Sequence, residues 1–296
     1  MKSIQFFPAT RNESAIFSIL IPTWNNIDYV RCCVDSLKKN SKYTHQIIVH
    51  VNEGSDGTLD WVKTNQLDYS YSQQNVGVCY GFNAASTLAN TEFIILSDDD
   101  FYFAPDWDHH LLEEIRKTDQ RSFCISGTMI EHSDSRNKCA IAPHDFGKTV
   151  QEFDEQKFLI KYSTIPFTDW SGSSWYPLAM PTSMWKLIGG LSVEFSPGMG
   201  SDPDMMMKLW NAGVRYYKGV SASRVYHFGS RTTARVKRNN GYRQFLLKWG
   251  IANSTFYKYF LRLGESFQAD VQPPQGLKFR VAKLKDRLMK IMSSFF

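Results

Sequence analysis

The sequence predicts an α/β fold in which helices flank a mostly parallel central sheet. In the first half of the chain, short apolar runs alternate with segments of helical periodicity, and polar turn-forming segments follow the apolar runs. This alternation is typical of βαβ units, whose strands pair in parallel. In addition, three aspartates at 98–100 directly follow the apolar run 93–96. Ligands of open α/β sheets bind beyond the carboxyl ends of the strands, so these carboxylates mark a candidate site.

The individual elements are predicted from apolar periodicity and from turn residues. The run 17–21, which Pro22 closes, is expected to form a central strand, and apolar residues at helical spacing follow over 27–37. The other expected segments are strands at 46–51, 69–72 and 93–96, helices beginning near 59, 81, 105, 183 and 202, and an ordered run over 175–180. Between 131 and 169 the periodicity is poor, and we expect an insertion loop there.

Composition places the chain among ordinary globular proteins. Of its 296 residues, 43% are hydrophobic and 21% are charged, which argues against global disorder. The five cysteines show no metal-binding spacing, which favours reduced thiols and a cytoplasmic location. The N-terminal apolar stretch is too short for a secretory signal, and no uncharged run could cross a bilayer. We therefore expect a cytoplasmic protein, at most peripheral at the cytoplasmic face of the membrane.

Charge is segregated along the chain. Up to residue 204 there are 16 Lys and Arg against 26 Asp and Glu, whereas from residue 205 onward there are 18 against 3. A basic segment suggests an anionic partner, and the candidates are nucleic acid, phospholipid head groups and a nucleotide diphosphate. The basic residues form no recognisable nucleic-acid module, so we expect no nucleic acid among the partners.

The three adjacent aspartates at 98–100 repel one another and favour a compensating cation. Carboxylate oxygens suit Mg²⁺ and Mn²⁺, and a metal held by one or two carboxylates usually also binds substrate phosphates. The alternative is a solvated acidic turn, which is the common fate of an isolated acidic run. The flanking sequence decides between these two interpretations.

Five short motifs follow one another over residues 16–230. They are Pro22-Thr23-Trp24-Asn25, Asn52-Glu53-Gly54-Ser55, Asn75-Val76-Gly77 with Asn83, Asp98-Asp99-Asp100, and Pro105-Asp106. Their order resembles that of the family 2 glycosyltransferases, which have the GT-A fold. The resemblance implies a catalytic domain over 1–230, with a nucleotide-sugar half at about 16–130 and an acceptor half at about 170–230. A basic helical extension over 231–296 follows it.

The resemblance also implies a donor site. The residues expected to bind the nucleotide sugar are Pro22, Thr23, Asn25, Glu53, Asn75, Gly77, Asp98, Asp99 and Arg231. Glu53 would accept the imide hydrogen of the base, although this turn departs from the family's paired aspartates. Taken singly, these residues would also suit ordinary turns.

The metal, Mn²⁺ or Mg²⁺, is expected to lie on Asp98, Asp100 and His227. Asp100 would be a direct ligand and Asp98 a ligand directly or through water, whereas Asp99 would contact the ribose or the donor sugar. The division of labour among the three carboxylates stays open. His227 lies between aromatic residues, so a plain core position is the alternative for it.

On the acceptor side, the resemblance implies that Asp202 is the catalytic base. An inverting transfer needs a base that removes the proton of the acceptor hydroxyl. Asp204 would hold an acceptor hydroxyl or orient its helix, and Trp175 would contact the acceptor. Helix capping is the alternative for Asp202. Ser201 occupies the position of the family's glutamate, which leaves open either a different acceptor or an inactive domain.

The C-terminal segment 276–296 has the pattern of a basic amphipathic helix. Its apolar stripe consists of Leu277, Val281, Leu284, Leu288, Ile291 and Phe295. Such a helix can lie in the interface of an anionic membrane, or it can pack on the protein's own surface or on a partner.

Together these features predict an inverting, metal-dependent glycosyltransferase. It would transfer a sugar from a nucleotide sugar, with UDP expected as the nucleotide, to a hydroxyl of a growing glycan such as a lipid-linked or surface polysaccharide. The alternative is a non-catalytic GT-A domain that binds nucleotide sugar or glycan.

Overall fold

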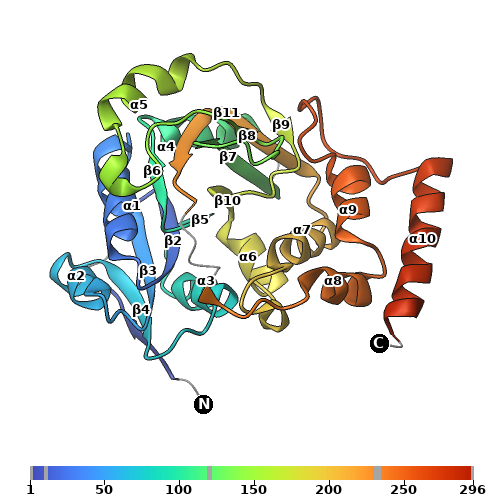
Figure 1. The fold of residues 1–296 in the computed structure, drawn as a ribbon, viewed down its shortest axis with the longest axis horizontal. Helices are drawn as coiled ribbons and strands as arrows, with labels where there is room; N and C mark the ends of the chain where they lie inside the picture. Colours follow the sequence, from blue (N-terminus) through green and yellow to red (C-terminus); the bar gives the residue numbers. More distant parts are fainter. Residues whose placement is uncertain (1–2, 10–12, 119–121, 230–234, 295–296) are drawn as a thin grey trace.

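The computed structural model describes residues 3–9, 13–118, 122–229 and 235–294 (Figure 1). Its strands are β1 Ile4–Phe7, β2 Phe17–Trp24, β3 Gln46–Asn52, β4 Asp68–Ser72, β5 Phe93–Leu96, β6 Phe101–Phe103, β7 Phe123–Glu131, β8 Ala140–Ile141, β9 Trp170–Ser171, β10 Leu178–Pro181 and β11 Tyr216–His227. Its α-helices are α1 Ile27–Asn40, α2 Thr58–Thr64, α3 Val78–Ser86, α4 Trp107–Lys117, α5 Glu155–Lys161, α6 Thr182–Ile188, α7 Ser201–Asn211, α8 Gly241–Trp249, α9 Asn253–Phe256 and α10 Leu277–Ser293.

One mixed sheet organises these elements. Its strand order is β1-β4-β3-β2-β5-β10-β7-β11-β6, with β8 beside β7 and β9 beside β11. The neighbours β4, β3, β2 and β5 are parallel, as the alternation of strands and helices predicts. Strand β10 lies antiparallel between β5 and β7, and β6 lies antiparallel to β11. The α/β class is confirmed, whereas the second half of the sheet is more mixed than expected.

Two predicted segments differ from the observed ones. Strand β2 does not end at Pro22 but continues to Trp24, because Pro22 still pairs with His50 of β3. The segment 131–169 is not a plain loop, since it contains β8 and α5. Aromatic packing holds this segment in place: Phe158 of α5 is buried and contacts Phe146 and other rings. The apolar residues of the segment do not recur at helical spacing, so the sequence pattern does not reveal it.

Two hydrophobic clusters cover the faces of the sheet. One includes side chains of α1 and α4, and the other includes side chains of α3, α6 and α7. The second cluster also contains Phe245 of α8, Phe256 of α9 and Val271. Helices α8 and α9 therefore lie against α7 rather than apart from the sheet (Figure 1).

Candidate active site

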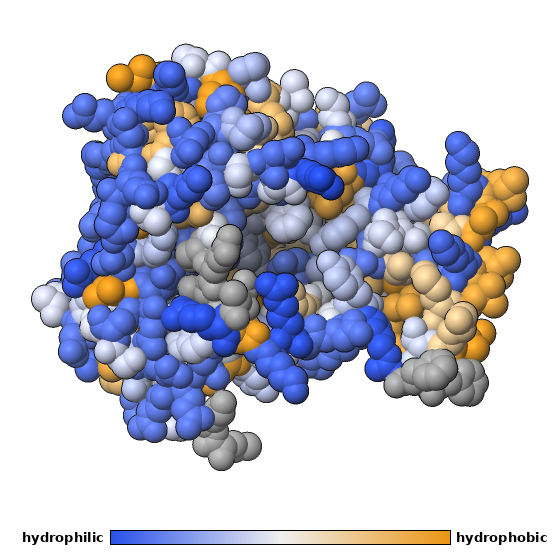
Figure 2. Space-filling model, in the orientation of Figure 1, coloured by the Kyte–Doolittle hydropathy of each residue, from blue (hydrophilic) through white to orange (hydrophobic). Residues whose placement is uncertain are grey.

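A cavity of about 760 Å³ lies beyond the carboxyl ends of β2, β3 and β5. The face of the molecule seen in Figure 2 is hollowed near its centre. The cavity is lined by nine of the residues expected from the sequence, namely Pro22, Thr23, Asn75, Gly77, Asp98, Asp99, Trp175, Asp202 and His227. The expected donor and acceptor sides therefore share one space.

Strand pairing brings Asp98, Asp100 and His227 together. Asp98 follows β5, and Asp100 directly precedes β6. Strand β6 runs antiparallel to β11 with Phe101 opposite His227, so Asp100 lies beside the end of β11. Each of the three side chains offers one ligand atom, and these atoms all lie within 4.8 Å of one another. Two carboxylates and an imidazole in this arrangement could hold a divalent cation.

Glu131 contacts His227 on the side of the imidazole ring opposite to Asp100. Strands β7 and β11 are parallel, and Glu131 is the register partner of His227. The two ring nitrogens of His227 therefore face different carboxylates: Nδ1 lies 3.1 Å from Glu131 Oε1, and Nε2 lies 3.6 Å from Asp100 Oδ2. Burial lowers the pKa of His227, but Asp100 and the hydrogen bond with Glu131 outweigh it and raise the pKa to about 9.

Sequence reasoning missed Glu131, because it begins the segment interpreted as a loop. Its position suits a residue that orients the imidazole, since metal-binding histidines usually donate their second N–H to a carboxylate or carbonyl. The signal that could have revealed it is the pairing of β7 with β11, which no local pattern in the sequence encodes.

The aspartates of the cavity lie in a region of negative electrostatic potential. Burial, followed by the charge of Asp100, raises the pKa of both Asp98 and Asp99. Asp99 accepts hydrogen bonds from Thr23 Oγ1 at 2.6 Å and from Asn26 Nδ2 at 3.1 Å. These carboxylates are not a solvated turn, because Asp99 and Asp100 are buried. A divalent cation would relieve their mutual repulsion, and the donor set fits Mn²⁺ or Mg²⁺.

Asn25 and Glu53 form a turn at the edge where the nucleotide is expected. Both have a positive φ, 45° and 61° respectively. Asn25 Nδ2 donates to Glu53 Oε2 at 3.1 Å, and the backbone N–H of Asn75 donates to Glu53 Oε1 at 3.4 Å. Neither Asn25 nor Glu53 lines the cavity itself. The structure thus joins these two residues to Asn75 in one turn assembly at the edge of the cavity.

The buried Asn52 connects the end of β2 to the loop before α3. Its side chain donates to the carbonyl of Thr23 at 3.2 Å and accepts from the backbone N–H of Val76 at 2.8 Å. Gly77 follows with φ 84°, and a Cβ there would lie 2.5 Å from Ser196 Oγ. Gly77 therefore allows a close approach to the loop before α7, which explains why the donor and acceptor sides meet at this position.

Asp202 lies in the first turn of α7 and faces the cavity. The helix begins after Gly200 without a side-chain capping hydrogen bond, so Asp202 does not act as its cap. Tyr176 donates its hydroxyl hydrogen to Asp202 Oδ1 at 2.9 Å. Burial raises the pKa of Asp202 to about 6, while the hydrogen bond from Tyr176 opposes the rise. The carboxylate is therefore mostly ionised at neutral pH and able to accept a proton.

The antiparallel strand β10 brings Tyr176 and Trp175 to this position. Leu178 is paired with Leu96, so the residues before β10 lie beside those that follow β5. Tyr176 therefore lies near both Asp202 and Asp98. Burial and the charges of these two carboxylates raise the pKa of its hydroxyl. Trp175 is 37% exposed and lines the cavity. Tyr176 was not predicted, because an inserted antiparallel strand leaves no local signal.

Comparison with known proteins identifies the family. The family model described as "Glycosyl transferase family 2" matches residues 18–174. The chain belongs to glycosyl transferase family 2. The matched part of this family 2 chain contains β2 from its second residue, the strands β3 and β5, and the aspartates 98–100.

Two curated relatives are consistent with membership of this family. The chain is 24% identical over 259 residues to a hyaluronan synthase of Pasteurella multocida, covering 84% of this chain and 24% of that protein. It is 29% identical over 105 residues to EpsH of Bacillus subtilis, covering 34% of this chain and 30% of that protein. The chain thus spans less than a third of the length of either relative.

A solved structure supports the GT-A fold. The chain resembles GalNAc-T7, solved with UDP, GalNAc and Mn²⁺, with a TM-score of 0.56 and 16% identity. The match covers 82% of this chain and 50% of GalNAc-T7. At this identity the likeness concerns the fold alone.

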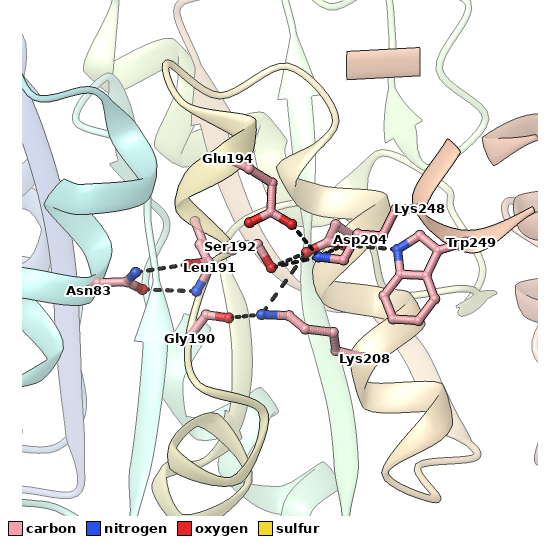
Figure 3. A network of polar contacts seen from close by, with 9 residues as sticks. All are labelled: Asn83, Gly190, Leu191, Ser192, Glu194, Asp204, Lys208, Lys248 and Trp249. Atoms are coloured by element: carbon pink, nitrogen blue, oxygen red, sulfur yellow. Dashed lines mark hydrogen bonds and ion pairs between the residues drawn. The ribbon is translucent and has the colours of Figure 1, made fainter. Parts of the chain in front are cut away.

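The structure of the family 2 chain places Asp204 outside the cavity. Its side chain is fully buried and accepts hydrogen bonds from Ser192 Oγ at 2.6 Å and Trp249 Nε1 at 2.8 Å. Lys248 Nζ lies 2.8 Å from Asp204 Oδ1, and Lys208 Nζ lies 4.0 Å from Oδ2 (Figure 3). Asp204 does not line the cavity, because Lys248 and Trp249 of α8 and Ser192 occupy its oxygens. Of its two expected roles, this position suits the orientation of α7.

Asn83 of the family motif takes part in the same region. Its side-chain amide donates to the carbonyl of Leu191 at 2.8 Å and accepts from the N–H of Leu191 at 2.8 Å (Figure 3). This pair of hydrogen bonds fixes α3 to the loop that leads toward α7. Asn83 therefore links the half expected to bind the donor to the half expected to bind the acceptor.

The basic segment after β11 reaches the end of β2. The guanidinium of Arg235 lies 4.4 Å from the centre of the Trp24 ring and donates to the carbonyl of Trp24 at 2.6 Å. Arg238 lines the cavity. Arg231, expected at the donor phosphates, lies outside the described residues.

Proposed function

We propose that the chain is an inverting, metal-dependent glycosyltransferase that transfers a sugar from a nucleotide sugar to a hydroxyl of a growing glycan. The observation that carries the proposal is the shared cavity. Asp98 and His227 line it together with the carboxylate of Asp202, and Asp100 completes with Asp98 and His227 a group that could hold a cation. A leaving diphosphate and an attacking hydroxyl need these two kinds of group in one site.

Asp202 is the base in this proposal. Its carboxylate takes the proton of the acceptor hydroxyl while the hydroxyl oxygen forms a bond to the anomeric carbon of the donor. The bond between that carbon and the diphosphate oxygen breaks, and its electron pair leaves with the diphosphate. Because attack and departure are in line, the configuration at the anomeric carbon inverts. The hydrogen bond from Tyr176 holds Asp202 in position and keeps its pKa from rising further.

Asp98, Asp100 and His227 would hold Mn²⁺ or Mg²⁺, with Glu131 orienting the imidazole. When bound, the cation offsets the negative charge that develops on the departing diphosphate. Asp99 would contact the ribose or donor sugar, and the hydrogen bonds from Thr23 and Asn26 orient it for that contact. The presence of UDP and Mn²⁺ in the structure of GalNAc-T7, which shares the fold, supports a UDP-linked donor.

On the acceptor side, Trp175 would stack against a sugar ring. A hyaluronan synthase among the relatives supports a glycan acceptor, and we extend this to a lipid-linked or surface polysaccharide assembled at the cytoplasmic face of a membrane. Ser201 does not contribute a carboxylate, and its hydroxyl donates to the carbonyl of Gly198 at 2.7 Å. That difference from the family motif supports the second candidate, a domain that binds donor without transfer.

A donor panel tests the proposal. The thermal midpoint of the full chain would be measured with UDP-, GDP- and dTDP-sugars, with and without Mn²⁺, and release of the free nucleotide would be followed with glycan acceptors. We expect one UDP-sugar to stabilise the chain in a Mn²⁺-dependent manner and to be turned over. Asp100→Asn should lose the Mn²⁺-dependent shift, and the exposed control Asp60→Asn should retain it. Stabilisation without turnover across the panel would favour the binding domain, and a shift that ignores Mn²⁺ would refute metal dependence.

A further inference from the structure

Helix α10 is attached to the domain by one face only. Phe279 packs against the rings of Tyr259 and Phe260, with centroids 5.5 Å and 5.6 Å away. Asp286 is buried on the same face, and its Oδ2 accepts a hydrogen bond from the backbone N–H of Ala252 at 3.0 Å. These contacts fix the rotation of the helix about its axis, so its opposite face points away from the protein.

The outward face is apolar. Six side chains on it are each between 56% and 76% exposed, namely Leu277, Val281, Leu284, Leu288, Ile291 and Met292. Ideal helical geometry places them within a sector of about 100°. They form an apolar strip along the edge of the molecule at the right of Figure 2. Exposed apolar side chains gathered in this way mark an interaction surface rather than scattered surface residues.

Basic side chains border the strip on both sides. Lys278 and Lys285 follow one edge and Arg280 and Arg287 the other, and all four are exposed. The acidic residue of the helix, Asp286, faces inward. A second copy of the chain would bring these like charges against one another, whereas an anionic surface would complement them.

We propose that α10 binds an anionic lipid bilayer by lying in its interface. The leucine-rich strip would enter the boundary between head groups and acyl chains, and the flanking lysines and arginines would contact the anionic head groups. Across the described part of the chain, no helix is long and apolar enough to span a membrane. The proposal is independent of the transfer reaction, because it concerns a surface outside the cavity.

Vesicle co-sedimentation of the full chain tests this proposal without donor or acceptor. The probes are vesicles of phosphatidylcholine alone and of phosphatidylcholine mixed with phosphatidylglycerol. We expect at least about tenfold stronger binding to the mixed vesicles. The double variant Leu284→Gln/Leu288→Gln should weaken that binding about tenfold, because both side chains would insert. The matched control Leu187→Gln alters another exposed leucine, on α6, and should bind as the original chain does.

Thermal midpoints and sedimentation velocity complete the test. Both leucines are more than half exposed, so the variant should keep its thermal midpoint. Equal vesicle binding by the double variant would overturn the proposal, as would equal binding to both kinds of vesicle. A lipid-free dimer that the leucine substitutions dissociate would instead assign the strip to a second copy of the chain.

Discussion

Asp99 and Asp100, which follow β5, are buried like Asp204 of α7, but the surroundings of the two sites differ. Asp204 lies within 2.8 Å of Lys248 Nζ and also accepts hydrogen bonds from Ser192 and Trp249. Asp98 and Asp99 lie instead beside Asp100, and burial and this neighbouring charge raise their pKa. Lys248 lies directly against Asp204, whereas the site after β5 concentrates three adjacent carboxylates at a cavity, where His227 is a cationic neighbour of Asp98 and Asp100.

This difference separates two roles that buried acidic residues can have. A carboxylate paired with lysine and tryptophan stabilises the packing of the helices that supply those residues. Carboxylates crowded together at a cavity raise the free energy of the ligand-free protein and are stabilised by a cation. Asp202, two residues before Asp204, belongs to the cavity group, and its pKa of about 6 suits proton transfer.

The largest expected effect separates Asp202 from Asp204 by activity. Asp202→Asn removes the base and should lower the transfer rate by about 10²- to 10⁴-fold, measured as nucleotide release in the presence of acceptor. The Mn²⁺-dependent thermal shift should remain, because Asp202 does not belong to the cation cluster. A rate within about tenfold of the original would exclude Asp202 as the base.

Asp204→Asn should act on stability instead. The substitution removes the charge of a fully buried carboxylate and weakens its hydrogen bonds, while Lys248 keeps Glu194 as a second carboxylate partner at 2.7 Å. We expect a loss of roughly 1–3 kcal/mol in free energy of unfolding. Urea denaturation followed by circular dichroism measures this loss. The exposed control Asp60→Asn should leave the midpoint unchanged. If Asp204→Asn kept full stability but lost transfer, the contrast between the two carboxylates would be wrong.

Glu131→Gln tests how far the cation cluster extends. The amide can still accept a hydrogen bond but carries no charge, so the imidazole of His227 loses its anionic partner. Residues in this position typically change metal affinity by about 10- to 100-fold, and we expect Mn²⁺ binding by calorimetry to weaken within that range. Unchanged affinity would limit the site to Asp98, Asp100 and His227.

The smallest effect concerns the pH profile. With Asp202 as the base, kcat/KM should fall as the pH drops through about 6, because the carboxylate becomes protonated. The hydrogen bond from Tyr176 lowers the pKa of Asp202, so Tyr176→Phe should move this acid limb to higher pH. A limb that stays in place or moves to lower pH would contradict the pairing.

Local patterns in the sequence predict the donor half of the sheet well. The strands β2, β3 and β5 have continuous apolar runs, and the residues that follow them reach one edge because parallel strands share direction. The placement of β10 and β11 is different, because β10 is inserted antiparallel between β5 and β7 and β11 lies beyond β7, an order that the alternation of strands and helices does not predict. Tyr176 and Glu131 enter the site through those pairings and were therefore missed.

The packing of α8 also has a practical consequence for shortening the chain. A cut after residue 230 would remove Lys248 and Trp249 from Asp204 and strip Phe245 and Phe256 from the cluster that covers one face of the sheet. The cut chain would expose apolar surface and would tend to aggregate. A shortened version intended for crystallisation or assay should instead end near residue 275, just before α10, and retain α8 and α9.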